Sequence, residues 1–364
     1  MENLVLYRKY RPKTFKEVVN QEHIIRTLTN ALSMNKVAHA YLFSGPRGTG
    51  KTTVARLLAK AVNCQDRQNH EPCNQCPACQ EINQGRCLDL IEIDAASNRG
   101  IDEIRELRNG IKFTPTSLKY KVFIIDEVHQ LTKEAFNALL KTLEEPPAHA
   151  IFILATTEIH KVPQTIISRC QRFDFHKLTL EKIVDRLAWI SQQEKVAIEK
   201  PALELIALNA DGSIRDGESL LGQIMAMEDK RITLEEVQTI LGVIDIKAVQ
   251  ELVEYLTAKN NSQAISHINQ VASQGYDLIQ FSKSLIGYLR KMMILKVDPN
   301  LANLVAPELT KEQLDVIIKQ GQKFSQIDLI KTIHLFIQAA NQIKSADFPQ
   351  LPLELAVVEC CQKE

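Results

Sequence analysis

The sequence predicts an α/β domain with a parallel, helix-covered sheet, followed by two helical modules. Short apolar runs alternate with helical stretches as far as about Leu178. A glycine-rich loop joins the first of these runs to a helix, and runs of strand length stop after Leu178. Alternation of this kind is typical of parallel sheets, whose strands are buried on both faces.

The predicted strands are runs of strand length made largely of apolar residues. They cover Tyr41–Ser44, Leu90–Asp94, Val122–Asp126 and Ile151–Ala155. The helices between them show apolar residues at helical spacing and cover Lys51–Val62 and Lys133–Glu145. Because strands alternate with helices over this part of the chain, we expect one parallel sheet over residues 1–178.

Helical patterns continue to the end of the sequence. The second module is expected to contain helices over Thr179–Glu194, Pro201–Ala210, Ser213–Met227 and Thr233–Leu241. Pro201 suits a first turn, and Gly212 suits a helix end. A third helical region runs from about Ile244. We therefore expect three domains: residues 1–178 with an insertion at 64–79, residues 179–242, and residues 243–364.

Length and composition limit the class of protein. A chain of 364 residues exceeds what one core usually organises. No window is apolar enough to span a bilayer, and residues 1–11 lack the apolar block of a signal peptide. We expect a cytoplasmic protein, where clustered cysteines favour metal over disulfides. The net charge is zero, but residues 1–180 carry an excess of about six positive charges.

The glycine-rich loop has the pattern GxxxxGKT between a strand and a helix. Glycines let backbone N–H groups converge on phosphate oxygens, and the helix N-terminus adds partial positive charge. Lys51 would bridge the outer phosphates, and Thr52 would bind Mg²⁺. A chance match is the alternative, which the correct flanking elements disfavour. The predicted nucleotide-binding residues here are Gly45, Gly48, Thr49, Gly50, Lys51, Thr52 and Thr53.

Two carboxylates end the predicted strand at 122–126. Asp126 suits a carboxylate in the second coordination shell of Mg²⁺, and Glu127 suits a base that polarises the attacking water. A solvated acidic turn is the alternative, which the preceding phosphate loop disfavours. Thr157 ends the next strand, where a hydroxyl would sense the γ-phosphate. Arg215 begins a helix of the second module and would reach the nucleotide; a surface salt bridge is its alternative.

Four cysteines lie close together in the predicted insertion, with the spacing Cys64-x8-Cys73-x2-Cys76-x2-Cys79. Four thiolates suit tetrahedral Zn²⁺, and a closed shell of this kind is structural, not catalytic. Iron–sulfur ligation is the poorer alternative. Cys87 lies nearby and is expected to be a small buried apolar residue.

Several segments resemble the tau/gamma subunits of the bacterial DNA polymerase III clamp loader, which are AAA+ ATPases. They are Tyr7–Phe15, Gly45–Thr52, Ile93–Ser97, Ile125–His129, Asn137–Pro147 and Ser168–Cys170. The similarity is dense to about Leu241 and is mainly a helical pattern beyond it. The resemblance implies an AAA+ sheet with a zinc-binding insertion, an all-helical lid domain and an all-helical oligomerisation (collar) domain.

The resemblance also implies residue roles. Tyr7, Arg11 and Val19 would lie at the base and ribose end of ATP. Thr157 and Arg215 would be the two nucleotide sensors. Arg169 would be an arginine finger that enters the ATP site of a neighbouring subunit, where a guanidinium stabilises charge during phosphoryl transfer. The four clustered cysteines would hold zinc.

The implied partners are other clamp-loader subunits in a ring of about five, the sliding clamp, primer–template DNA and the DNA polymerase III core. The family is commonly catalogued as a DNA-directed DNA polymerase, although no polymerase active site is expected here. Candidate DNA contacts are helix starts, where backbone N–H groups face phosphates; ordinary helix capping is the alternative. They are Ser97, Asn98, Arg99, Gly100, Thr132 and Lys133.

Two other functions fit part of the pattern. A translocating AAA+ helicase would share the phosphate loop, but no aromatic pore loop is recognisable. A scaffold that binds ATP weakly would not need the set Lys51, Asp126, Glu127 and Arg169. We therefore expect an ATPase that loads a clamp during DNA replication.

Overall fold

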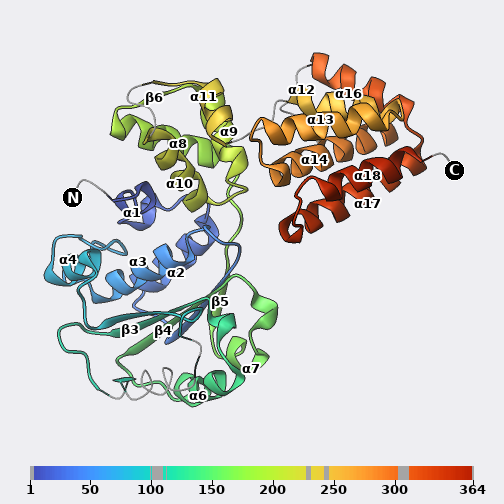
Figure 1. Ribbon diagram of the computed structural model, residues 1–364. Helices are drawn as coiled ribbons and strands as arrows, with labels where there is room; N and C mark the ends of the chain where they lie inside the picture. The colour runs from blue at the N-terminus through green and yellow to red at the C-terminus, as the bar shows by residue number, and fades with distance from the viewer. Residues whose placement is uncertain are drawn as a thin grey trace. The chain divides into compact units, whose positions relative to one another are not determined.

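The computed structural model describes residues 4–98, 100, 110–111, 113–226, 231–241, 246–301 and 311–362, without the side chains of residues 239, 311 and 312. The chain divides into two compact units, Met1–Val237 and Gln238–Glu364 (Figure 1). Arg99 and the predicted boundary at residues 242–243 lie outside the described residues.

Unit 1 contains a parallel sheet of five strands in the order β2-β3-β4-β1-β5. The strands are β1 (Ala40–Ser44), β2 (Leu90–Asp94), β3 (Lys121–Asp126), β4 (Ala150–Thr156) and β5 (Gln171–Asp174). Ser44 pairs with Thr156 on one side and with Asp174 on the other. The carboxyl ends of these strands therefore meet at one edge, and the predicted parallel α/β fold is confirmed.

Two hydrophobic cores cover the two faces of this sheet. Successive residues of β3 alternate between them: Val122 and Ile124 belong to one core, Phe123 and Ile125 to the other. Helices α2 (Glu22–Ser33) and α3 (Lys51–Asn63) cover the first face. Helices α6 (Lys133–Glu144) and α7 (Gln164–Ile167) cover the second (Figure 1). Burial on both faces explains why the central strands are continuous apolar runs.

Asp89, which precedes β2, anchors the connection to β3. Its side chain is fully buried and accepts hydrogen bonds from the backbone N–H groups of Thr116, Ser117 and Leu118 at 2.8–3.0 Å. Burial acts to raise the pKa of this carboxyl, but these backbone donors outweigh it and lower the pKa.

The remaining elements of unit 1 are short helices beside the sheet and a helical region after it. They are α1 (Leu6–Lys9), η1 (Phe15–Glu17), α4 (Pro77–Gln84), η2 (Val128–Gln130), η3 (Ile159–Lys161), α8 (Leu180–Glu194), α9 (Lys200–Asn209), α10 (Ile214–Met225) and α11 (Leu234–Leu241), whose last residues belong to unit 2. In its described residues, the region after residue 178 is helical apart from a pairing of two-residue strands, β6 (Ala197–Ile198) and β7 (Arg231–Ile232).

Unit 2 is helical throughout its described part. It contains α12 (Ile246–Thr257), α13 (Asn261–Ser273), α14 (Leu278–Val297), η4 (Pro299–Leu301), α16 (Lys311–Lys323), α17 (Gln326–Gln342), η5 (Ile343–Ser345) and α18 (Leu351–Cys361). One core joins these helices and includes Leu285, Leu289 and Met292. None of the described helices is both long and apolar enough to cross a bilayer.

Candidate functional site

The phosphate loop connects β1 to α3 at the carboxyl edge of the sheet. Gly45 has φ +143°, and a Cβ on it would lie 2.3 Å from the carbonyl oxygen of Phe175, which follows β5. Gly50 has φ +99° and precedes the first residue of α3. Only glycine adopts such angles without strain, so both positions require it for this loop shape.

Lys51 begins α3 and is 6% exposed. Its Nζ donates to the carbonyl oxygens of Gly45 and Pro46 at 2.7 and 2.8 Å. Burial lowers its pKa, although the carboxylates of Glu127 and Asp126 oppose this effect. A cationic side chain is thus held inside a loop of backbone N–H groups, an arrangement that suits phosphate.

Thr52 and Asp126 meet across this edge of the sheet. The Thr52 hydroxyl donates to Asp126 Oδ2 at 2.7 Å, joining the first turn of α3 to the end of β3. A hydroxyl and a carboxylate at this position, beside a phosphate-binding loop, are the donor set that Mg²⁺ uses in P-loop NTPases. The two residues therefore fit a Mg²⁺ ion beside a bound phosphate.

Glu127 follows β3 with φ +48°, an unusual angle for a residue with a side chain. Its Oε2 accepts hydrogen bonds from the hydroxyl and the backbone N–H of Thr157, at 2.8 and 3.2 Å. The nearly buried ring of His129 lies 3.4 Å from the same oxygen. This places the predicted base and the predicted sensor in direct contact.

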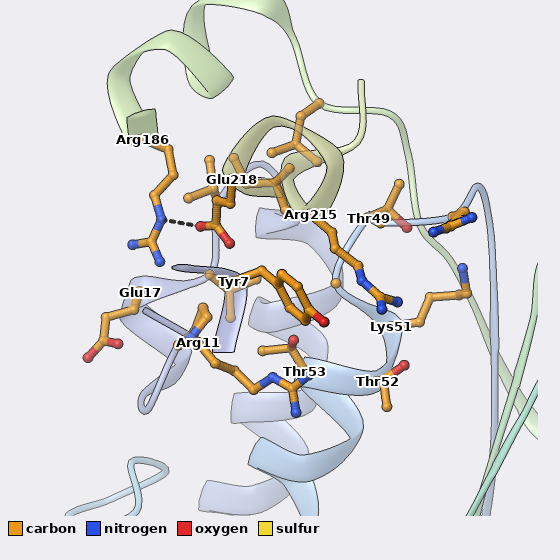
Figure 2. A pocket seen from close by; sticks show the side chains of 18 of the residues that line it. Tyr7, Arg11, Glu17, Thr49, Lys51, Thr52, Thr53, Arg186, Arg215 and Glu218 are labelled. Carbon is orange, nitrogen blue, oxygen red and sulfur yellow. Dashed lines mark hydrogen bonds and ion pairs between the residues drawn. The ribbon is translucent and has the colours of Figure 1, made fainter. Parts of the chain in front are cut away.

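Figure 2 shows Arg215 pointing into the cavity beside Tyr7 and toward Lys51. Arg215 lies in the first turn of α10, and its guanidinium lies 4.9 Å from the centre of the Tyr7 ring. A hydrogen bond from Arg215 lowers the pKa of Tyr7. The Ser213 hydroxyl accepts the N–H of Asp216 and caps this helix. The region after residue 178 thus contributes a cation to the cavity.

One cavity brings together most of the predicted site residues. Its lining includes Tyr7, Arg11, Val19, Gly48, Thr49, Gly50, Lys51, Thr52, Thr53, Asp126, Glu127 and Arg215. Burial lowers the pKa of Arg11, and the neighbouring Arg56 lowers it further. Gly45 and Thr157 contact this lining through Lys51 and Glu127 respectively.

Arg169 is separate from this cavity. It follows α7, and its side chain forms an ion pair with Glu144 at 2.5 Å and donates to the carbonyl oxygen of Thr165 at 2.8 Å. Its side chain is 33% exposed. Its ion pair with Glu144 lies at the surface, where ion pairs contribute little stability, so Arg169 can exchange this carboxylate for another molecule at little cost.

A buried ion pair beside the cavity was not predicted from the sequence. Arg186 on α8 and Glu218 on α10 lie 3.0 Å apart, with side chains 10% and 7% exposed (Figure 2). Arg186 also donates to the carbonyl oxygen of Tyr10. Burial raises the pKa of Glu218, and Arg186 opposes this. One feature of the sequence could have indicated that Glu218 is buried: it lies on the apolar stripe of a predicted helix, next to Leu221 and Ile224.

The four predicted zinc ligands converge. The sulfur atoms of Cys64, Cys73, Cys76 and Cys79 all lie within 4.8 Å of one another. Tetrahedral ligands about 2.3 Å from one zinc ion would be about 3.8 Å apart. Two of the pairs here are separated by 3.9 Å, for Cys73 and Cys79, and by 4.0 Å, for Cys64 and Cys76. Cys87 is buried.

Backbone groups surround the sulfur of Cys73. Burial acts to raise the pKa of this thiol, but hydrogen bonds from the backbone N–H groups of Gln75 and Cys76 lower it to about 6. Thiolates are the form that binds metal. The donor set and its spacing therefore fit a four-cysteine zinc site.

The candidate DNA contacts lie at two places. Ser97 and Asn98 form a turn after β2, where their N–H groups donate to the carbonyl oxygen of Asp94. The Thr132 hydroxyl accepts the N–H of Ala135 at 3.2 Å and caps α6. Capping alone accounts for Thr132.

Three protein families match this chain in succession. Residues 20–179 match the family described as DNA polymerase III, delta subunit. Residues 182–230 match the ATPase lid domain of the DNA polymerase III clamp loader subunit, and residues 232–364 match domain III of subunits gamma and tau.

Curated relatives match over most of the chain. DNA polymerase III subunit tau of Bacillus subtilis is 46% identical over 100% of this chain and 64% of its own length. Subunit tau of Escherichia coli is 44% identical over 82% of this chain and 46% of its own length. Subunit gamma of Buchnera aphidicola from Acyrthosiphon pisum is 36% identical over 98% of both proteins. This chain thus spans less than two thirds of the tau subunits.

Solved structures show more distant likenesses. The Bacillus subtilis DNA clamp loader delta protein is 15% identical over 93% of this chain and 99% of its own, with a TM-score of 0.40. Thermotoga maritima RuvB is 20% identical over 73% of this chain and 86% of its own, with a TM-score of 0.49. On the strength of the gamma and tau relatives, the chain belongs to the tau/gamma family of DNA polymerase III subunits.

Proposed function

We propose that this chain is the ATP-hydrolysing subunit of a DNA polymerase III clamp loader, which places a sliding clamp on primed DNA during replication. The observation that supports this best is the convergence of Lys51, the Thr52–Asp126 pair and the Glu127–Thr157 pair at one sheet edge. Family membership supports the identity of the complex.

In the proposed reaction, the loop N–H groups and Lys51 bind the phosphates of ATP. Thr52 and Asp126 would hold the Mg²⁺, whose charge would offset that of the phosphates. Glu127 polarises a water molecule that attacks the γ-phosphorus as the bond to the β–γ bridging oxygen breaks, giving ADP and phosphate. Thr157 orients Glu127, and Arg215 contacts the phosphates from the lid. Tyr7, Arg11 and Val19 take the base and ribose.

The site is completed in trans, by Arg169 of a neighbouring subunit. Within its own chain, Arg169 contacts Glu144 and does not line the cavity among the described residues. A guanidinium supplied by a neighbour makes hydrolysis depend on assembly.

The cysteine cluster holds structural Zn²⁺ in this proposal. Burial raises the pKa values of Cys64 and Cys79, so both thiols keep their protons when no metal is bound. A thiol that coordinates a metal loses its proton, so zinc would deprotonate both. The spacing of the four sulfur atoms supports this assignment.

We assign residues 1–178 to the ATPase domain, 179–242 to the lid and 243–364 to the oligomerisation collar. Helices α17 and α18 support the collar because each has exposed apolar residues at the helical spacings of three, four or seven. These are Ile327, Ile330 and Ile337 on α17, and Leu351, Leu355 and Val358 on α18. Joint replacement of Ile330 and Leu355 by Asp should lower the mass measured by light scattering, whereas Lys283→Asp should not.

The proposed partners are other clamp-loader subunits in a ring of about five, the sliding clamp, primer–template DNA and the polymerase III core. The DNA contacts would come from the turn at Ser97 and Asn98 and from Lys133. An assembly of this kind works at the nucleoid.

The deciding experiment measures clamp loading on primed DNA with the Lys51→Ala variant. Loss of the positive charge should abolish nucleotide binding and loading, because Lys51 is the buried cation whose Nζ lies within the phosphate loop, bonded to the carbonyl oxygens of Gly45 and Pro46. Lys36→Ala, on the exposed end after α2, is the matched control and should load normally. Normal loading by Lys51→Ala, with no wild-type chain present, would refute the proposed function.

A further inference from the structure

A short segment of backbone, residues 13–16, joins two parts of the cavity lining. We name it the strap. Arg11 and Pro12 precede it and Glu17, Val18 and Val19 follow it, and all five line the cavity. Within the strap, Phe15 is 1% exposed and packs in the core that α2 and α3 form with the sheet. Displacing the strap would therefore move both flanking parts of the cavity.

Glu71, from the cysteine insertion, holds one end of the strap. Its two carboxylate oxygens accept the backbone N–H groups of Phe15 and Lys16, at 2.8 and 3.1 Å. These are the first N–H groups of η1, which have no partner within that helix. The backbones of Gln68 and Glu71 pair with each other at 3.2 and 3.0 Å, which fixes Glu71 within the loop. Glu71 lies two residues before Cys73.

Lys60 holds the other end. It is 2% exposed, and its Nζ donates to Lys13 O at 2.8 Å, Asn74 Oδ1 at 2.6 Å and Asn83 Oδ1 at 3.0 Å. These three bonds use all three protons of the ammonium group. Asn74 Nδ2 also donates to Lys13 O at 3.2 Å. Asn74 lies between Cys73 and Cys76, and Asn83 shares α4 with Cys79.

These contacts give the cysteine insertion a mechanical link to the cavity. Residues 64–76 contain no helix or paired strand beyond the single Gln68–Glu71 bridge. Ordering such a loop costs backbone conformational entropy. Coordination by four cysteines offsets that cost, since metal binding is coupled to the folding of its loop. Glu71 and Asn74 keep their positions only while the loop is ordered.

We infer that the cysteine insertion positions the nucleotide site: metal binding by the four cysteines and nucleotide binding are thermodynamically coupled, through Glu71, Asn74 and Lys60. This rests on the proposed zinc and nucleotide sites. Because coupling is reciprocal, zinc should tighten nucleotide binding and nucleotide should tighten zinc binding by the same factor. The three residues act as positioning residues and do not touch the nucleotide.

The test is a cycle of dissociation constants for a fluorescent ADP analogue, with zinc present and after chelation. In the wild type, chelation should weaken binding by roughly fivefold to tenfold, within the usual range of coupling between sites. The joint variant Glu71→Ala, Asn74→Ala should bind the analogue more weakly by a similar factor while retaining the zinc content of the wild type. Chelation should then have little further effect on the variant.

Glu81→Ala is the matched control, because Glu81 lies on α4 near the cysteines and has no hydrogen bond to the strap. It should behave as the wild type does. Unchanged affinity in the zinc-loaded joint variant would overturn the inference, even if chelation alone unfolds the protein. Failure of the zinc-loaded wild type to bind nucleotide would instead overturn the proposed function.

Discussion

The hydroxyl and the backbone N–H of Thr157 both donate to one carboxylate oxygen of Glu127, at 2.8 and 3.2 Å. The two residues follow β4 and β3, which are neighbours in the sheet. Glu127 therefore cannot turn away without losing two hydrogen bonds. In the proposed reaction, this fixes the base relative to both strands before ATP arrives, which is how a rigid site lowers the cost of orienting a water molecule.

Glu127→Gln should lower the ATP hydrolysis rate by about 10²–10⁴-fold, the usual contribution of a general base. The amide oxygen can still accept from Thr157, so the fold and the ATP dissociation constant should stay close to those of the wild type. The measurement is phosphate release at saturating ATP, beside an ATP titration. Glu134→Gln, in the exposed first turn of α6, is the control. A Glu127→Gln rate within about threefold of the wild type would exclude Glu127 as the base.

Arg215→Ala should weaken ATP binding by about 10–100-fold, the worth of a hydrogen bond to a charged group. The variant removes the cation that α10, in the region after residue 178, places beside Tyr7. Arg215→Lys should restore only part of the affinity, because an ammonium lacks the planar fork of a guanidinium. Arg231→Ala is the control, since Arg231 is exposed and pairs with Glu199. An unchanged dissociation constant in Arg215→Ala would show that Arg215 does not contact the nucleotide.

Much of the sheet was predictable because its central strands are buried on both faces. β2 spans Leu90–Asp94, as predicted; β1 and β3 begin one residue earlier than predicted, and β4 is longer by one residue at each end. β5 was not predicted. It lies at the sheet edge, and Phe173 is its only buried residue, so it shows no apolar run.

Part of the candidate site was predictable from the sequence, and part was not. The phosphate loop and the strand-end carboxylates are local patterns, and their residues meet at one sheet edge because parallel strands end there. The Arg186–Glu218 pair and the bonds from Glu71 to the strap join segments far apart in the sequence. A local pattern can mark Glu218 as a residue of an apolar helix face, but no local pattern identifies its distant partner, so single-sequence patterns do not predict such pairs.

Asp89→Asn should lower the thermal midpoint Tm at pH 7 by about 2–10 °C, because the backbone donors of residues 116–118 lose a charged acceptor. The folded-state pKa of Asp89 lies below its unfolded value. Its contribution is therefore complete above about pH 4 and is lost as the pH falls through the lower folded pKa. The difference in Tm between variant and wild type should shrink in that acid range.

Calorimetry across pH checks this prediction, with Asp185→Asn, an exposed residue of α8, as the control. A Tm difference that stays constant down to about pH 3 would show that the charge of Asp89 is not what stabilises the connection.

Arg169→Ala should reduce ATP hydrolysis by the assembled protein by about 10³-fold or more, the low end for an arginine finger. ATP binding should be unchanged, because Arg169 does not line the cavity of its own chain among the described residues.

The sharper test mixes Arg169→Ala with Lys51→Ala. Each variant alone is inactive, but at a mixed interface the Lys51→Ala chain donates an intact Arg169 to the ATP site of its neighbour. Hydrolysis should therefore reappear on mixing. The matched control is Arg172→Ala, an exposed arginine of β5 that pairs with Asp174, which should hydrolyse ATP without any partner. Continued inactivity of a mixture that has formed joint assemblies would mean that Arg169 acts on its own chain, or not at all.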